Sequence, residues 1–256
     1  MFATNPFTPL TAFVSPDIMQ GYVVLMVLAV AVGTLFDLLQ GKKLSFFLQD
    51  RKRAKAAAKQ QLGAAEMAAI AARTLVSDIA TFGEFCNTQR RISHALMFYG
   101  FVSYLVTSVV MVAVYPTETH PPLALPILWN IGVLMTLVGG YWFFFFLRVN
   151  VVHDGQPRWR LVRADLFIVS LLASVTFALF FELAGLAQNS AATRLFAGLY
   201  LIFTTLLFVS VPWSKFAHMF YKPVVAFQRR VEEADGSSDL PTPTTRGRER
   251  CPPSHT

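Results

Sequence analysis

The chain has 256 residues, of which 54% are hydrophobic and only 14% are charged, and its formal net charge is +7. Soluble domains carry about 25% charged residues, so this composition excludes an ordinary soluble protein. The hydrophobic residues form runs of roughly 20, the length that crosses a bilayer, which predicts a polytopic membrane protein. In such a protein the positive charge is typical of basic cytoplasmic loops and does not indicate nucleic-acid binding.

The two cysteines, Cys86 and Cys251, lie far apart in the sequence. Iron–sulfur clusters take four protein ligands and zinc sites use closely spaced cysteine pairs, so neither kind of site is predicted. We interpret both residues as reduced thiols without a function. The first 17 residues contain no Lys or Arg, so the sequence predicts no cleavable signal peptide.

The first half of the chain is predicted to contain one membrane span and one long loop. The N-terminal segment 1–18 is too short to form a domain, and the first span follows at 19–40. The loop 41–91 begins with basic residues and continues as an Ala-rich helix, which could lie on the membrane, receive a partner subunit, or form a solvated hairpin. The apolar face of this helix is predicted to consist of Met67, Ile70, Leu75, Ile79 and Phe82.

Four more spans are predicted at 92–115, 123–147, 164–187 and 195–213. The second span ends at the sequence YPTETHPP, whose prolines stop a helix. Together, residues 92–235 are predicted to form a four-helix membrane core with a cytoplasmic C-terminal extension. The tail 236–256 is rich in Gly, Ser, Pro, Thr and Arg, so we expect it to be disordered.

The basic residues predict the orientation of the five spans. The loop 41–91, the loop 148–163 and the region after 214 fall on one side of the membrane and contain 21 of the 22 Lys and Arg residues. The positive-inside rule then places the N-terminus outside and the C-terminus in the cytoplasm. The predicted fold is therefore an all-α integral membrane protein built as a five-transmembrane-helix bundle.

Two of the five histidines are predicted to lie at the same membrane depth. His94 begins the second span and His218 follows the end of the fifth, and these two spans run antiparallel. Two imidazoles at one depth on different helices form the arrangement that bis-histidine haem b requires. The alternative is that both histidines only cap their helices in the headgroup region.

Basic side chains flank both histidines and are predicted to hold the anionic haem propionates. They are Arg90, Arg91, Lys215 and Lys222. The same charges also satisfy the positive-inside rule, so their presence alone does not distinguish the two alternatives. His153 lies in a polar loop and is a weaker ligand candidate, whereas His120 and His255 are interpreted as incidental.

Two motifs resemble a known superfamily. The stretch RRISHALMFYGF, followed by Thr107, and the stretch VPWSKFAHMFYKP are similar to the membrane subunits of quinone-linked respiratory complexes. These include the gamma subunit of respiratory nitrate reductase and the membrane subunits of the quinone-interacting and sulfite-reduction-associated complexes. The segment Asp165–Leu183 resembles the fourth span of these proteins, and the match covers about 92–222. The resemblance implies five helices in a bacterial inner membrane, with a periplasmic N-terminus and a cytoplasmic C-terminus.

Within this superfamily the chain most resembles the membrane anchors associated with dissimilatory adenylylsulfate reductases, because it lacks the cysteine-rich ferredoxin domain of larger relatives. This resemblance implies a non-catalytic electron-transfer subunit that docks the cytoplasmic reductase subunits. Electrons from the oxidation of sulfite with AMP would then pass to quinone in the lipid bilayer. The chain contains no GxGxxG or P-loop, so it is not expected to bind a nucleotide itself.

The resemblance implies one haem b, ligated by His94 and His218 on the cytoplasmic side. Relatives with two haems carry further histidines at the positions where this chain has Tyr104 and Tyr200, so the outer haem is expected to be absent. Eighteen residues make five helical turns, so Tyr200 is expected to lie on the same helix face as His218.

Two other functions are compatible with the sequence. The first is a purely structural anchor without haem, in which the histidines are dispensable. The second is a small-solute transporter, but transporters usually carry polar sites or broken helices in mid-membrane. Here the acidic residues Asp37, Asp165 and Glu182 all lie near span ends, and Gly139–Gly140 is the one indication of a helix break.

Overall fold

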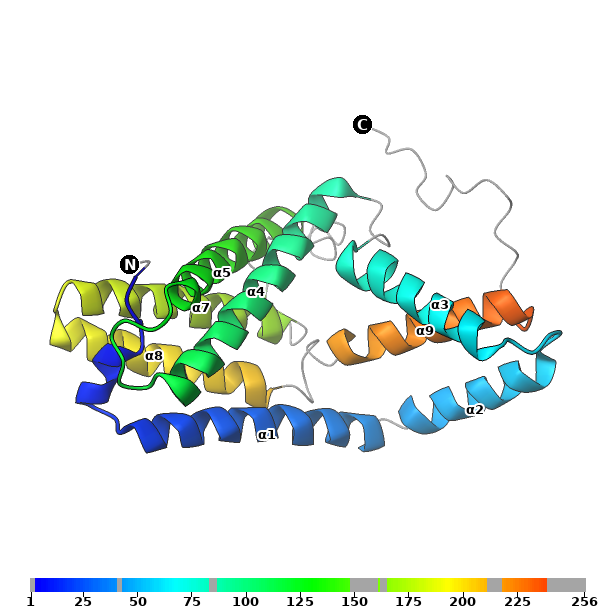
Figure 1. Cartoon of the computed structure of the whole chain (residues 1–256), viewed down its shortest axis with the longest axis horizontal. Helices are drawn as coiled ribbons and strands as arrows, with labels where there is room; N and C mark the ends of the chain where they lie inside the picture. Colours follow the sequence, from blue (N-terminus) through cyan, green and yellow to red (C-terminus); the bar gives the residue numbers. More distant parts are fainter. Residues whose placement is uncertain are drawn as a thin grey trace. The chain divides into compact units, whose positions relative to one another are not determined.

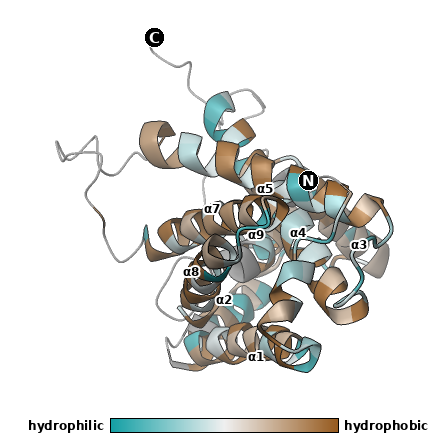
Figure 2. Cartoon of the chain, turned by 90° about the vertical axis from the view of Figure 1, so that its left-hand side faces the viewer, coloured by the Kyte–Doolittle hydropathy of each residue, from teal (hydrophilic) through white to brown (hydrophobic). Residues whose placement is uncertain are grey.

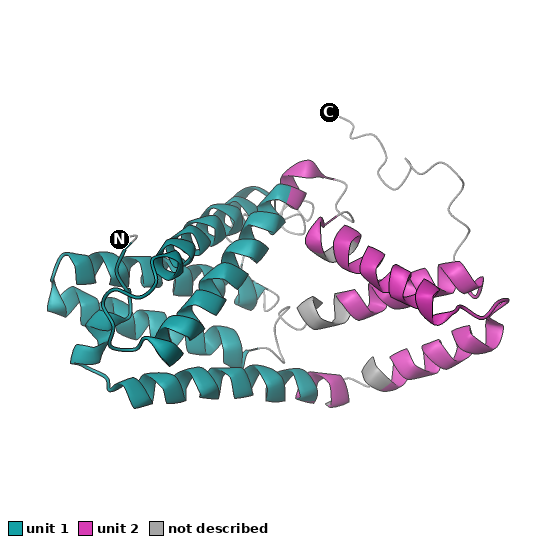
Figure 3. Cartoon of the chain, viewed as in Figure 1, with its two compact units in different colours: residues 1–35, 92–216 teal, residues 36–91, 217–256 magenta. Residues whose placement is uncertain are grey.

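The computed structural model describes residues 3–40, 43–82, 87–147, 161, 165–210 and 218–238, and within these ranges every regular element is helical (Figure 1). The chain divides into two compact units (Figure 3). Unit 1 comprises Met1–Leu35 and Ile92–Phe216, and unit 2 comprises Phe36–Arg91 and Ala217–Thr256. The predicted first span therefore belongs mainly to the same unit as the later four.

Five helices are long and apolar enough to cross a membrane, which confirms the prediction of an all-helical, five-span protein. Hydrophobic colouring predominates along these helices in Figure 2. They are α1 (Pro16–Gln40), α4 (Thr88–Val114), α5 (Ala124–Trp142) with its π-helical extension η3 (Phe143–Leu147), α7 (Leu166–Leu186) and α8 (Ser190–Val209). The orientation of the spans stays a prediction.

Two helix boundaries differ from the predicted spans because polar residues extend the helices beyond their apolar runs. Helix α4 begins at Thr88, so Arg90 and Arg91 are already helical. Helix α8 begins at Ser190, because the side chain of Asn189 accepts a hydrogen bond from the backbone N–H of Ala192 at 3.0 Å. Such a cap fixes the start of a helix independently of hydropathy.

The N-terminal segment folds onto unit 1 through the short 3₁₀ helix η1 (Thr8–Ala12). The Asn5 side chain donates to the carbonyl oxygen of Tyr115 at 2.8 Å. Phe7 is buried and lies edge-on to the ring of Trp129, with 6.0 Å between the ring centroids. The segment is too short to be a domain, but it contributes to the core of unit 1.

Helices α4 and α5 cross at very short range through small residues. A Cβ atom added to Gly100 would lie 2.6 Å from the backbone nitrogen of Thr136. One added to Gly132 would lie 2.8 Å from the carbonyl oxygen of Gly100. The Ser93 hydroxyl also donates to the carbonyl oxygen of Gly139 at 2.8 Å. Such backbone approach is the usual way in which helices associate in a membrane, where dispersion contacts and hydrogen bonds replace the hydrophobic effect.

Helices α7 and α8 form a hairpin joined by the three residues from Ala187 to Asn189. Their facing aromatic side chains stack, with 5.5 Å between the ring centroids of Phe177 and Phe203. The hydroxyls of Ser174 and Thr204 share a buried hydrogen bond of 2.7 Å between the same two helices. This hairpin supplies the buried residues Glu182 and Tyr200 to the interior of unit 1.

Unit 2 is formed by the predicted loop and the C-terminal helix. Its elements are α2 (Lys43–Ala57), α3 (Ala64–Thr74), the π-helix η2 (Leu75–Ala80) and α9 (His218–Asp235). The backbone N–H of Lys59 donates to the carbonyl oxygen of Asp235 at 2.9 Å, and Nη2 of Arg230 donates to the Ser77 hydroxyl at 2.6 Å. The loop is therefore a folded helical structure that packs against α9.

Along the predicted apolar face of the loop helix, Leu75 is 58% exposed. The helix changes from α to π hydrogen bonding after Thr74, which shifts the direction of the following side chains. Thr74 and Phe82 are buried on either side of this π-helix. The side chain of Ile79 lies outside the described residues.

Helix α9 ends at a glycine in the left-handed conformation. Gly236 has φ of +77°, a common way to stop a helix, and Ser237 is buried. The folded part of the chain thus extends into the first residues of the predicted tail. Residues 239–256 lie outside the described residues, so their expected disorder stays a prediction.

Candidate functional site

His94 lies in the second turn of α4 and is half-buried. The neighbouring Ser93 is fully buried and hydrogen-bonded to α5. Helix geometry places successive side chains about 100° apart, so His94 lies beside the α4–α5 contact and not inside it. The α4–α5 crossing therefore fixes the part of α4 that carries His94, and an iron ligand needs such a rigid support.

The two arginines before His94 have different environments. Arg90 is one turn earlier on the same face of α4 as His94. Within the described part of the chain, the buried Nε of Arg90 has no hydrogen-bond partner. Nε of Arg91 donates to the carbonyl oxygen of Thr81 at 2.6 Å. Arg90 therefore fits an anionic group such as a haem propionate, whereas Arg91 holds the preceding segment to α4.

His218 is the first residue of α9 and belongs to unit 2, whereas His94 belongs to unit 1. The side chains of His218 and Lys222 lie outside the described residues, as do Lys215 and His153 entirely. The donor chemistry fits haem b, because two imidazoles are the axial ligands that it needs. The pairing of His94 with His218 stays a prediction.

The expectation of one continuous helix from Tyr200 to His218 is wrong. Helix α8 ends at Val209, and α9 begins anew at His218. Pro212 follows closely in the sequence and lacks the amide hydrogen that would continue the helical hydrogen bonding. Tyr200 and His218 are therefore on different helices, and the argument that they share one helix face does not hold.

Tyr104 and Tyr200 come together in the interior of unit 1, although they lie on α4 and α8. Both side chains are buried, and they lie close enough to interact with each other. The ring centroids of Tyr104 and Trp129 are 5.7 Å apart, and those of Tyr200 and Phe7 are 6.5 Å apart. These are the two positions at which two-haem relatives are expected to carry histidines.

Four aromatic side chains thus fill the space around these two positions. The indole Nε1 of the fully buried Trp129 also donates to the Ser108 hydroxyl at 2.9 Å, which fixes the orientation of the ring. A porphyrin between Tyr104 and Tyr200 would have to displace Trp129 and Phe7. The absence of an outer haem stays a prediction.

A second polar site, missed by the sequence interpretation, joins α5 and α7. Glu182 is only 3% exposed, and Asn130 is fully buried. The Asn130 amide nitrogen donates to Oε1 of Glu182 at 3.1 Å and to the carbonyl oxygen of Pro126 at 3.0 Å. Among the described residues, Oε2 of Glu182 has no hydrogen-bond partner. An asparagine within an apolar run was the available signal, because such residues in membrane helices usually face a polar partner.

Replacing Asn130 by leucine is expected to destabilise the protein by about 1–3 kcal/mol, because the buried Glu182 carboxyl group loses its donor. Denaturant unfolding of the detergent-solubilised protein, followed by circular dichroism, measures this loss. The matched comparison is the same change in a Glu182→Leu background. There the cost of Asn130→Leu should fall, since no carboxyl group is left unsatisfied. If Asn130→Leu lowers the free energy of unfolding equally in both backgrounds, the contact between Asn130 and Glu182 is not the source of the loss.

Two neighbouring groups on α4 could contribute to holding a metal-bound cofactor. The imidazole of His94 can ligate iron, and the Arg90 guanidinium can bind a carboxylate. A comparison of the chain with protein-family models, with curated proteins and with solved structures found no match.

Proposed function

We propose that this protein is a membrane anchor that docks a cytoplasmic adenylylsulfate reductase and passes its electrons to the quinone pool through one haem b. The observation that carries this proposal is the combination of two motifs, RRISHALMFYGF and VPWSKFAHMFYKP, on a chain with five helices able to span a membrane. Each motif places a histidine close to the end of a helix, beside basic residues. The proposal includes the periplasmic N-terminus and cytoplasmic C-terminus that the basic residues predict.

The proposed cofactor site uses His94 and His218 as iron ligands and Arg90 as a propionate partner. Bound haem b supplies one-electron transfer between the reductase and quinone. The protein residues would hold and orient it: α4 fixes His94 through the short crossing with α5, and the buried Nε–H of Arg90 can donate to an anionic partner. Arg91, Lys215 and Lys222 lie next to these ligands in the sequence and add positive charge.

The proposed docking surface is the basic part of unit 2. Arg51, Lys52 and Arg53 are exposed along α2, where they can meet acidic residues of the reductase. Complementary charge mainly raises the association rate and fixes the orientation of two proteins, so docking should weaken as the salt concentration rises. Sulfite and AMP combine on the reductase to form adenylylsulfate and release two electrons, which reduce a quinone together with two protons.

The proposal is tested by producing the chain together with the reductase in a haem-replete host. The reductase is expected to co-purify with the membrane fraction, and the isolated anchor should show a b-type band in a reduced-minus-oxidised spectrum. Membranes should reduce quinone when sulfite and AMP are both supplied. Co-purification without the b-type band would instead indicate a purely structural anchor, and a soluble reductase in the presence of the folded anchor would refute docking.

A further inference from the structure

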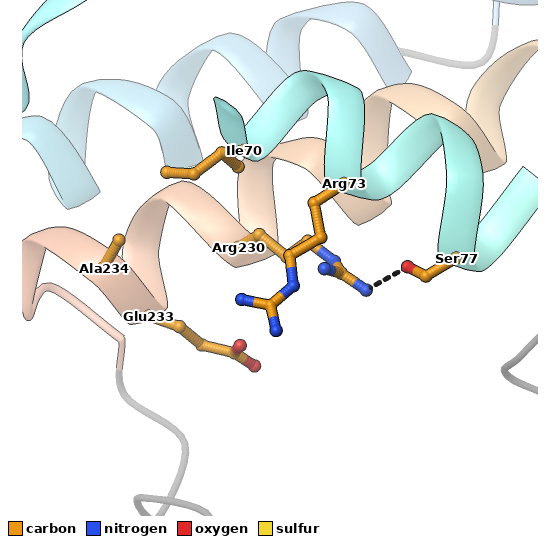
Figure 4. A pocket seen from close by; sticks show the side chains of 6 residues that line it. All are labelled: Ile70, Arg73, Ser77, Arg230, Glu233 and Ala234. Carbon is orange, nitrogen blue, oxygen red and sulfur yellow. Dashed lines mark hydrogen bonds between the residues drawn. The ribbon is translucent and has the colours of Figure 1, made fainter. Parts of the chain in front are cut away.

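Unit 2 contains a hollow of about 480 Å³ between α3 with η2 on one side and α9 on the other (Figure 4). Its lining residues are Ile70, Arg73, Ser77, Arg230, Glu233 and Ala234. Binding sites for small molecules usually have volumes of about 300–1,000 Å³, so a small polar group fits here. The described lining residues include neither His94 nor the exposed basic residues of α2.

Helical spacing explains how these side chains come to one place. Residues three and four apart share a face of a helix, and the two packed faces supply three lining residues each. Nη2 of Arg230 donates to the Ser77 hydroxyl at 2.6 Å, which holds the guanidinium of Arg230 against η2. Figure 4 shows the guanidinium of Arg73 reaching from α3 into the same space.

The charges around the hollow favour an anionic ligand. Two guanidinium groups repel each other when they share a small space, and the described part of the lining contains one acidic residue, Glu233. Oε1 of Glu233 already accepts a hydrogen bond of 3.1 Å from Nε of Arg229, which does not line the hollow. Positive charge therefore exceeds negative charge at this place. A guanidinium binds phosphate oxygens through two parallel hydrogen bonds, more specifically than a lysine ammonium does.

We propose that Arg73 and Arg230 form a binding site for a phosphate group, with the Ser77 hydroxyl as an additional polar contact. The phosphate can belong to the headgroup of an anionic phospholipid or to a soluble phosphate. A membrane protein meets anionic lipids at its surface, and basic pockets of this kind are known to bind them. The proposal does not depend on the haem or on the reductase.

The test measures the thermal unfolding of the purified full-length protein in a neutral detergent. One series adds phosphatidylglycerol, with phosphatidylcholine as its control, and a second adds inorganic phosphate, with chloride at matched ionic strength. We expect at least one of the two phosphate sources to stabilise the wild-type protein above its control. In Arg73→Gln the concentration for half-maximal stabilisation should rise by roughly tenfold or more, because a bidentate contact is lost. For Arg73→Lys this concentration should lie between those of the wild type and Arg73→Gln. Lysine keeps the positive charge but lacks the planar guanidinium that makes two parallel hydrogen bonds.

Arg53→Gln is the matched control, because it removes the same charge from an exposed position on α2 of the same unit. It should leave the ligand response unchanged. Stabilisation by phosphatidylglycerol alone assigns a lipid headgroup, and stabilisation by inorganic phosphate assigns a soluble ligand. The proposal is overturned if neither phosphate source stabilises the wild-type protein more than its control does. It is also overturned if Arg73→Gln and Arg53→Gln show the same stabilisation by the phosphate source. Arg73 is exposed, so its replacement tests the site even if Arg230→Gln fails to fold.

Discussion

Replacing His94 by alanine is expected to abolish the b-type absorption band of the purified protein, and replacing His218 is expected to do the same. Haem b is held without a covalent bond, so each axial imidazole is a large part of its affinity. Even outer partners of a metal site change its affinity by about 10–100-fold, and a direct ligand should matter at least as much. Haem content per protein, measured from the reduced-minus-oxidised spectrum, gives the result.

His120→Ala and His153→Ala are the matched controls, because each removes one imidazole elsewhere in the chain. His120 is exposed, and its ring nitrogen lies 3.4 Å from the carbonyl oxygen of Ala3. Both controls should keep the b-type band. A band retained in His94→Ala, or lost in His120→Ala, would contradict the assigned ligands. Retention of the reductase by a haem-free His94→Ala variant would show that docking and electron transfer are separable.

The same spectrum distinguishes the two adjacent arginines. Arg90→Gln should lower haem retention, because Nε of Arg90 is buried without a partner among the described residues and is available to a propionate. Arg91→Gln removes the same charge but mainly loses the 2.6 Å hydrogen bond to Thr81. Equal effects of the two changes would indicate that only the local charge matters.

The membrane spans could be predicted from the sequence because bilayer crossing depends on local hydropathy alone. The proline-rich stretch after Tyr115 correctly predicted the end of α4. The polar ends of the helices were harder to predict from the sequence. The beginning of α8 depends on a side-chain cap at Asn189, and α4 continues through the polar residues Thr88–Arg91. Hydropathy does not register either feature.

Contacts between distant segments could not be predicted from one sequence. Ser77 and Arg230 are 153 positions apart, and Asn5 and Tyr115 are 110 apart. Both contacts use ordinary polar groups whose partners are decided by tertiary packing. For this reason the loop 41–91 left three alternatives open, although the structure shows it folded with α9 in one unit.

The candidate site was predictable where chemistry is local and missed where it depends on the face of a helix. The histidines and their basic neighbours are recognisable from residue type and position. Glu182 was interpreted only by its place near a span end, whereas its side chain faces Asn130 in the interior. The sequence singled out Tyr104 and Tyr200 only as positions without a haem ligand, whereas their burial next to each other and the contact of Tyr104 with Trp129 depend on the fold.

The other large effect is expected from Gly132→Val at the crossing of α4 and α5. A Cβ atom at this position would lie 2.7 Å from the backbone nitrogen of Tyr104 and 2.8 Å from the carbonyl oxygen of Gly100. Backbone atoms cannot rotate away as side chains do, so the two helices must separate. Overpacking of well-packed interiors costs about 1–3 kcal/mol, and a backbone clash should lie at or above the upper end.

Gly198→Val on α8 provides the matched control, because a Cβ atom there would meet nothing within 4 Å. It should be neutral or slightly stabilising, since valine has the higher helix propensity. The midpoints of denaturant unfolding in detergent compare the two variants, and equal midpoints would show that the close crossing is not a source of stability.

The same crossing connects the fold to the proposed cofactor site. A Cβ atom at Gly139 would lie 2.7 Å from the carbonyl oxygen of Ser93, the residue before His94. Gly139→Val should therefore displace the part of α4 that carries His94, and lower haem retention more than Gly132→Val does for the same loss of stability. A variant that loses stability but keeps full haem content would show that the position of His94 is set by other contacts than the α4–α5 crossing.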